Sequence, residues 1–344
     1  MKLFANFTHI VYDSYLNLHA DTGGDLPWTK SHEPYGRRKS ITLPRISKPD
    51  MPSLILSTPF FLIAAILLYL VYGVSESYAP LLVAPFVCLA AIFVFSPQIN
   101  WWWFKRHPPD LAKPLRPLIA QSPYYRRLSE KLQLRFRQKV NMLMIGTDYK
   151  KPTDEGGVPE DIKAAVAGSA VPLLLGLEDL LFPPFEYVVV YATPFPSPQY
   201  PTKMHLSEIY EEDGVVLFSA EHLLKGFLKP EQFFPIGMYE YARIFLRLRE
   251  KKNLSRPGVE ENAWQALESM SGYSRARIAQ WINLNESDID LPAVAVVHFF
   301  IFPERFRELL PALYEAYCKL FQQNPLDFAA LERRFAAEGD QYAK

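Results

Sequence analysis

The stretch MPSLILSTPFFLIAAILLYLVYGVS, from Met51 to Ser75, contains no Asp, Glu, Lys or Arg. About 20 apolar residues in a helix are enough to cross the hydrocarbon core of a bilayer, which is about 30 Å thick. This stretch is therefore long enough to span a membrane, and we predict a first span over about residues 52–74.

A second uncharged stretch follows directly, between Glu76 and Lys105. It contains LLVAPFVCLAAIFVF and predicts a second span over about residues 78–97. Together the two spans predict a transmembrane helical hairpin over residues 51–104. The alternative is a pair of buried helices in a soluble core.

Prolines and aromatic residues mark the second span. Pro85 should kink its first turns, and Pro97 should end it. The cluster from Trp101 to Phe104 is typical of the aromatic belt that lies at a membrane interface.

Basic residues flank both outer ends of the hairpin, whereas its connection holds only Glu76. The flanking residues are Arg37, Arg38, Lys39, Arg45 and Lys48 before the first span, and Lys105 and Arg106 after the second. Because basic residues collect on the cytoplasmic side, we expect a multi-pass protein of the cell membrane with both termini in the cytoplasm.

The composition of the chain excludes several classes of function. Its 37 basic and 37 acidic side chains cancel, whereas a nucleic-acid partner requires a concentrated basic excess. Its two cysteines, Cys88 and Cys318, are too few for a disulfide framework or a cysteine metal cluster. We expect the lipid bilayer as a partner and no nucleic acid.

Outside the hairpin, the sequence predicts one α-rich α+β domain with a small sheet. The predicted segments are a loosely ordered cytoplasmic stretch over 1–50, a proline-containing linker over 105–121, the domain over 122–330 and a C-terminal tail over 331–344. Strands are expected over 185–192 and 214–218, which are β-branched and aromatic.

Three further segments of the domain have clear patterns. We predict a long helix over 122–144, a polar loop over 147–157 and a helix from Pro159 to about Leu181. The first helix is rich in basic residues, which either lie on anionic headgroups or form a solvated face. These residues are Arg126, Arg127, Lys131, Arg135, Arg137 and Lys139.

The stretch MYEYARIF, from Met238 to Phe245, predicts a helix with an informative pattern. In zincin metallopeptidases the motif His-Glu-x-x-His places two zinc-binding imidazoles on one helical face, and its glutamate activates the metal-bound water. Here the same frame has Tyr239, Glu240 and Arg243.

The order of segments around this helix resembles the zinc-dependent, glucose-regulated peptidase family named after the Mlc titration factor. The resemblance runs from about Pro117 to Pro325 and does not cover residues 1–105. It rests on segments 162–177, 187–193 and 214–219, on Gly226, and on PAVAVVHFFIFP (292–303) and PALYEAYCKLFQQNP (311–325). It implies a zincin-like fold and a zinc cofactor.

Carried over by position, the resemblance places the two zinc histidines on Tyr239 and Arg243, the catalytic general base on Glu240 and the third ligand, a glutamate, on Val297. Tyrosine is a poor zinc ligand at neutral pH, arginine stays protonated, and valine has no donor atom. We therefore expect no metal cofactor and interpret Glu240 as a vestigial general base.

Two residues near these positions have open interpretations. Arg243 lies one helical turn from Glu240, which predicts an ion pair at the vestigial site; the alternative is a solvated pair on one helix face. His298 is a candidate alternative metal ligand, or else a hydrogen-bonded histidine on a packed helix.

The sequence as a whole predicts a membrane-anchored, cytoplasm-facing pseudopeptidase that binds a protein or peptide partner in regulation. The expected groove lies beside the 239–243 helix and is edged by the strand over 185–192 or 214–218. One alternative is an active zinc-dependent metallopeptidase with a re-sited metal. The other is a membrane scaffold that oligomerises through small residues of its hairpin, namely Ala64, Ala65, Ala90 and Ala91.

Overall fold

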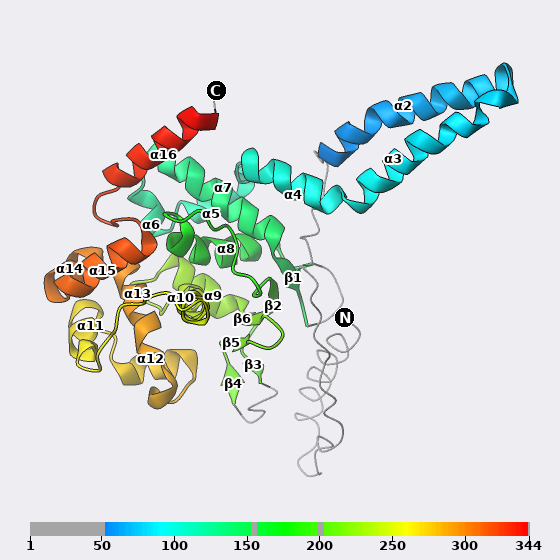
Figure 1. The fold of residues 1–344 in the computed structure, drawn as a ribbon. Coiled ribbons are helices and arrows are strands. Elements are labelled where there is room, and N and C mark those ends of the chain that lie inside the picture. The colour runs from blue at the N-terminus through cyan, green and yellow to red at the C-terminus, as the bar shows by residue number, and fades with distance from the viewer. Residues whose placement is uncertain (1–51, 153–156, 198–202, 343–344) are drawn as a thin grey trace, which may run out of the picture. The chain divides into compact units, whose positions relative to one another are not determined.

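The computed structural model describes residues 52–152, 157–197 and 203–342. The predicted N-terminal segment 1–50 lies outside these residues. The described chain divides into two units, one ending at Pro109 and the other beginning at Asp110 (Figure 1). The α+β class, helix-rich with small sheets and preceded by two apolar helices, is confirmed.

The N-terminal unit is a helical hairpin followed by a short helix. Its elements are α2 (Pro52–Gly73), the 3₁₀ helix η1 (Glu76–Leu82), α3 (Val83–Val94) and α4 (Ser96–Arg106). Both α2 and the continuous η1–α3 segment are long and apolar enough to cross a membrane. Only 11% and 6% of their apolar windows are buried, which argues against a pair of soluble core helices.

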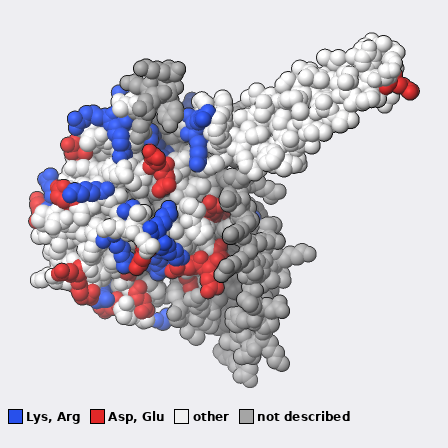
Figure 2. All heavy atoms as spheres, in the orientation of Figure 1, with Lys and Arg blue, Asp and Glu red and all other residues white. Residues whose placement is uncertain are grey.

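The second span differs in detail from the predicted helix over 78–97. It ends at Val94, and a new helix begins at Ser96 because Pro97 is well suited to a first helical turn. Pro85 lies in the first turn of α3, three residues after the 3₁₀ helix η1 ends at Leu82. Figure 2 shows the hairpin as a nearly uncharged surface, with an acidic side chain at its tip.

The C-terminal unit contains a four-stranded sheet of order β1-β2-β6-β5. The strands are β1 (Asp148–Lys150), β2 (Tyr187–Tyr191), β6 (Val215–Ser219) and β5 (Ser207–Tyr210). The first three are parallel, and β5 is antiparallel to β6 at the edge. A separate pair, β3 (Phe195–Pro196) and β4 (Met204–His205), is antiparallel.

This order corrects two predictions. The predicted polar loop over 147–157 contains β1, which is short and alternates in exposure. The predicted groove-edge strands over 185–192 and 214–218 are β2 and β6, which are both internal to the sheet and paired on both sides. The edge strand beside the motif helix is instead β5.

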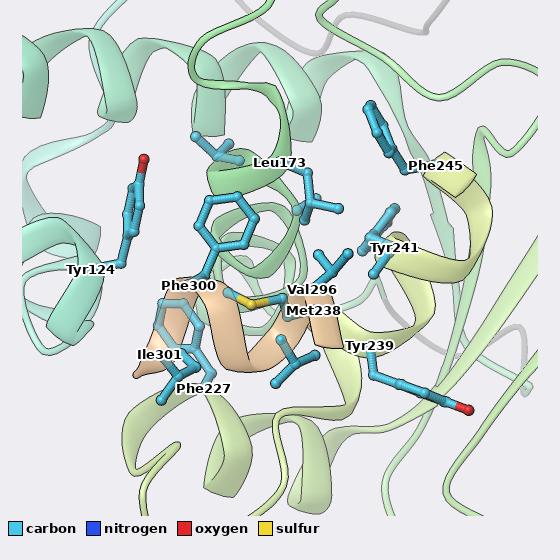
Figure 3. Packing of buried hydrophobic residues seen from close by; sticks show 14 of the residues in the cluster. Tyr124, Leu173, Phe227, Met238, Tyr239, Tyr241, Phe245, Val296, Phe300 and Ile301 are labelled. Atoms are coloured by element: carbon cyan, nitrogen blue, oxygen red, sulfur yellow. The ribbon is translucent and has the colours of Figure 1, made fainter. Parts of the chain in front are cut away.

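Helices pack on one face of the sheet around α8 (Glu160–Leu174). Nearly all of α8 is buried, because its small residues allow close approach by α7 (Glu130–Gly146), α9 (Ala220–Leu228) and α10 (Ile236–Lys251). It ends at Leu174, earlier than the predicted Leu181. Figure 3 shows the core that α8, α10 and α13 (Leu291–Ile301) share.

The remaining helices cover this core. They are η2 (Lys113–Leu115), α5 (Arg116–Ile119), α6 (Pro123–Arg126), α11 (Ala263–Ser271), α12 (Arg275–Ile282), η3 (Glu286–Asp288), α14 (Pro303–Leu309), α15 (Pro311–Phe321) and α16 (Ala329–Tyr342). The single helix predicted over 122–144 is therefore split into α6 and α7. The split occurs because Ser129 caps α7 by accepting the backbone N–H of Leu132.

Most basic residues of α6 and α7 contact protein rather than forming one charged face. Arg137 forms an ion pair with Asp110, and Arg127 donates to the carbonyl oxygens of Phe300 and Ile301. Lys139 is buried. The interpretation of these residues as a headgroup-binding face is therefore wrong for Arg127, Arg137 and Lys139.

Candidate functional site

The motif residue Glu240 is buried between α10 and β5, and both of its carboxylate oxygens accept hydrogen bonds. Nη1 of Arg243 lies 2.7 Å from Oε2, and the hydroxyl of Ser207 lies 2.7 Å from Oε1. Only 1% of the Glu240 side chain is exposed. The predicted contact between Glu240 and Arg243 is therefore present, and it is buried rather than solvated.

Arg243 is held between two acidic groups. Its Nε lies 4.0 Å from Oδ2 of Asp290, in addition to its contact with Glu240. Burial is the largest single influence on the pKa of Arg243 and lowers it. The charge of Glu240 and its hydrogen bond, together with Tyr239 and Asp290, outweigh burial, so that the pKa is raised. The guanidinium thus provides a permanent positive charge beside the Glu240 carboxylate.

Tyr239, which the family resemblance predicts at the position of the first zinc histidine, is fully buried. Its hydroxyl oxygen accepts the backbone N–H of Asp290 at 2.9 Å, and the guanidinium of Arg243 lies 5.6 Å from its ring centre. Burial raises the pKa of Tyr239 well above its ordinary value. The side chain is therefore a neutral phenol that ties α10 to the start of α13.

The other two candidate positions lie on α13, which packs against α10. Val297 is a buried core residue. His298 is also buried; its Nδ1 lies 2.8 Å from the carbonyl oxygen of Val294 and its Nε2 lies 2.9 Å from Oγ of Ser271 on α11. Burial lowers the pKa of His298 to about 4. Both ring nitrogens are thus used in contacts within the core.

This donor set does not fit a zinc site. A catalytic zinc needs about three protein ligands and an open position, whereas these positions hold a neutral phenol, a guanidinium paired with the carboxylate, and an aliphatic side chain. Among residues 52–152, 157–197 and 203–342, no group of three or more His, Cys, Asp or Glu side chains is arranged to hold a metal ion.

Glu240 is also poorly placed to act as a base by itself. Its carboxylate is inaccessible to solvent, and its two oxygens are engaged by Ser207 and Arg243. In this arrangement the carboxylate of Glu240 holds the edge strand β5 against α10.

A second carboxylate, Glu208, lies on β5 next to Ser207. It accepts the hydroxyl of Ser197 at 2.6 Å and that of Tyr210 at 3.2 Å. Burial raises the pKa of Glu208. Because neighbouring residues of a strand point to opposite faces, Glu208 faces away from the side on which Ser207 meets Glu240.

Sequence reasoning missed Ser207 and Asp290. Ser207 lies in a strand of four residues, which has too few positions for a clear alternating pattern. Asp290 had a readable signal, since it precedes Leu291 and Pro292 in the pattern of an N-cap followed by an early proline. In the structure its Oδ1 accepts the N–H of Ala293 and caps α13.

Comparison with known sequences agrees with the course of the fold. The sequence profile of the family described as glucose-regulated metallo-peptidase M90 matches residues 101–322. The match includes α10 and α13 and begins after the two apolar helices. No curated protein matches the chain.

Proposed function

The chain belongs to the glucose-regulated metallopeptidase family M90, and we propose that it is a membrane-anchored pseudopeptidase that binds a protein or peptide without cleaving it. The observation that carries this proposal is the 2.7 Å ion pair between Arg243 and Glu240. It places a fixed cation beside the carboxylate that the family resemblance identifies as the catalytic base. With Arg243 in this position, the carboxylate of Glu240 is paired with a guanidinium instead of facing a metal-bound water.

The membrane part of the proposal is supported by the two exposed apolar helices. A chain anchored through α2 and the η1–α3 segment, with basic residues flanking both outer ends, would hold its peptidase-like domain in the cytoplasm. This arrangement would make any partner of the domain a cytoplasmic protein or peptide.

The binding part is supported by the position of β5. Among the described residues β5 pairs only with β6, and the carbonyl oxygen of Leu206 accepts the N–H of Ser219. Since hydrogen-bonding directions alternate along an antiparallel pair, the backbone groups of Ser207 and Ile209 face away from β6. An extended peptide would add to this edge as a further strand, beside the buried Glu240.

Two experiments test the proposal. Peptides selected from a displayed random library on the full-length protein should bind Ile209→Val as they bind the wild type, but Ile209→Pro at least about tenfold more weakly, since proline removes the outward N–H. Equal binding to both variants would contradict an edge-strand site.

The loss of catalysis is tested separately with a labelled, unfolded protein substrate. The wild type should show no zinc-dependent cleavage. The comparison is Tyr239→His combined with Arg243→His and Val297→Glu, a variant that reintroduces the ligand types of the family. Zinc-dependent cleavage by the wild type that disappears in Glu240→Gln would refute the pseudopeptidase proposal.

A further inference from the structure

The helix α4 begins after the second apolar segment, which is by itself long enough to cross a membrane. At the rises typical of their helix types, α2 is about 33 Å long, and η1 with α3 is about 32 Å long. Each length matches a hydrocarbon core of about 30 Å. The second crossing therefore brings the chain, at Val94, back to the membrane surface at which α2 begins. The eleven residues of α4 lie beyond the hydrocarbon core.

A hydrogen bond fixes α4 to the start of α2. The side-chain oxygen of Asn100 accepts the backbone N–H of Ser53 at 3.0 Å, and Asn100 is buried. Ser53 is the second residue of α2, so its N–H is one of the four that have no partner inside the helix. Asn100 thus caps α2 from another helix, and Figure 1 shows the chain changing direction between α3 and α4 at this end of the hairpin.

The outer face of α4 combines aromatic rings with positive charges. Trp102 is 52% exposed and Trp103 is 42% exposed, while Trp101 and Phe104 are partly buried. The guanidinium of Arg106 lies 4.0 Å from the ring centre of Trp102, and Nζ of Lys105 lies 5.8 Å from that of Trp101. Tryptophan beside Arg or Lys is typical of the lipid headgroup layer. The amphipathic indole ring lies at the boundary between water and hydrocarbon, and the cation binds lipid phosphate.

We infer that α4 is an interfacial helix, which lies on the bilayer surface at the base of the hairpin and binds phospholipid headgroups through Trp102, Trp103 and Arg106. This inference rests on the membrane attachment proposed above and adds a third membrane-contacting element to the two spans. It assigns Asn100 the role of holding that element at the depth where α2 begins.

The depth of α4 is measurable with the full-length protein reconstituted in phosphatidylcholine and phosphatidylglycerol vesicles. Lipids brominated either near the headgroup or near the bilayer centre quench tryptophans at their own depth. The signal of Trp102 and Trp103 is the difference between the wild type and Trp102→Phe combined with Trp103→Phe. A reference at mid-membrane is Phe61→Trp, since Phe61 is an exposed residue near the middle of α2.

The inference predicts that shallow bromines reduce the difference signal of Trp102 and Trp103 more than deep ones do, whereas the order is reversed for Phe61→Trp. Deeper quenching of the α4 tryptophans, or none, while the reference behaves as expected would overturn the interfacial assignment and leave the membrane attachment standing. Absence of quenching at the reference would instead refute the membrane attachment itself, and the inference with it.

Discussion

The guanidinium of Arg243 donates to the carboxylate of Glu240 at 2.7 Å, one turn apart on α10 and shielded from solvent. Breaking a buried pair by removing one partner costs about 3 kcal/mol or more, because the other charge is left buried. We therefore expect Arg243→Met to lower the free energy of unfolding by about that amount, measured by urea unfolding in detergent.

The same helix offers a matched control. Arg247 forms an ion pair with Glu211, but the two side chains are 31% and 40% exposed, so Arg247→Met should cost less than about 1 kcal/mol. Glu240→Gln combined with Arg243→Met should recover part of the loss, since no unpaired charge remains. If Arg243→Met costs no more than Arg247→Met, the pair between Arg243 and Glu240 does not stabilise the fold.

His298 should make the stability of the fold fall in mild acid. Burial lowers its pKa from 6.5 to about 4, so the unfolded chain binds more protons than the folded one between these values. The contribution of neutral His298 to the free energy of unfolding is complete above about pH 6.5. It is lost as the pH falls, by roughly 2 kcal/mol at about pH 5.

A variant isolates this contribution from that of other titrating groups. The free energy of unfolding of the wild type minus that of His298→Gln should decrease as the pH is lowered from about 7 to about 5. A difference that stays constant over this range would show that His298 is not buried as a neutral imidazole.

Lys139 should stabilise the end of α8. Its Nζ donates to the carbonyl oxygens of Leu174 at 2.7 Å, Leu177 at 2.6 Å and Asp179 at 3.2 Å, which satisfies groups that a helix end leaves unpaired. Lys139→Met should lower the free energy of unfolding by about 3 kcal/mol. Lys131, which is exposed and lies on α7 like Lys139, is the control. Lys131→Met should change the free energy of unfolding by less than about 0.5 kcal/mol.

The proposed orientation predicts which parts of the chain are accessible from outside the cell. In a chain with Cys88 and Cys318 replaced by alanine, a membrane-impermeant maleimide should label Ser77→Cys, at the start of η1 beside the hairpin connection, on intact cells. It should label Ala336→Cys, on the exposed side of α16, only after the membrane is permeabilised. The reverse order of labelling would place both termini outside.

Features that depend on residues close together in the sequence could be predicted, whereas contacts between residues far apart in the sequence could not. The two apolar spans and the strands β2 and β6 were predictable because burial requires continuous hydrophobic runs. The contact between Glu240 and Arg243 was predictable because helical spacing fixes it locally. Ser207 and Asp290 lie 33 and 50 residues from Glu240, and only tertiary packing brings them to α10.

The departures in the hairpin and the sheet have similar causes. A count of apolar residues does not distinguish one helix from two, so the break between Val94 and Ser96 that creates α4 was not predicted. The short strands β1 and β5 carry polar residues at positions that only their neighbours in the sheet define. The predicted groove edge was consequently assigned to strands that lie inside the sheet.

The central claim is that this member of a metallopeptidase family has replaced its metal by a buried ion pair. The most direct test is the zinc content of the purified full-length protein, measured by elemental mass spectrometry after incubation with excess zinc and removal of unbound metal. We predict that zinc stays far below one ion per chain and does not change in Glu240→Gln. One zinc ion per chain, lost in Glu240→Gln or His298→Ala, would contradict the account.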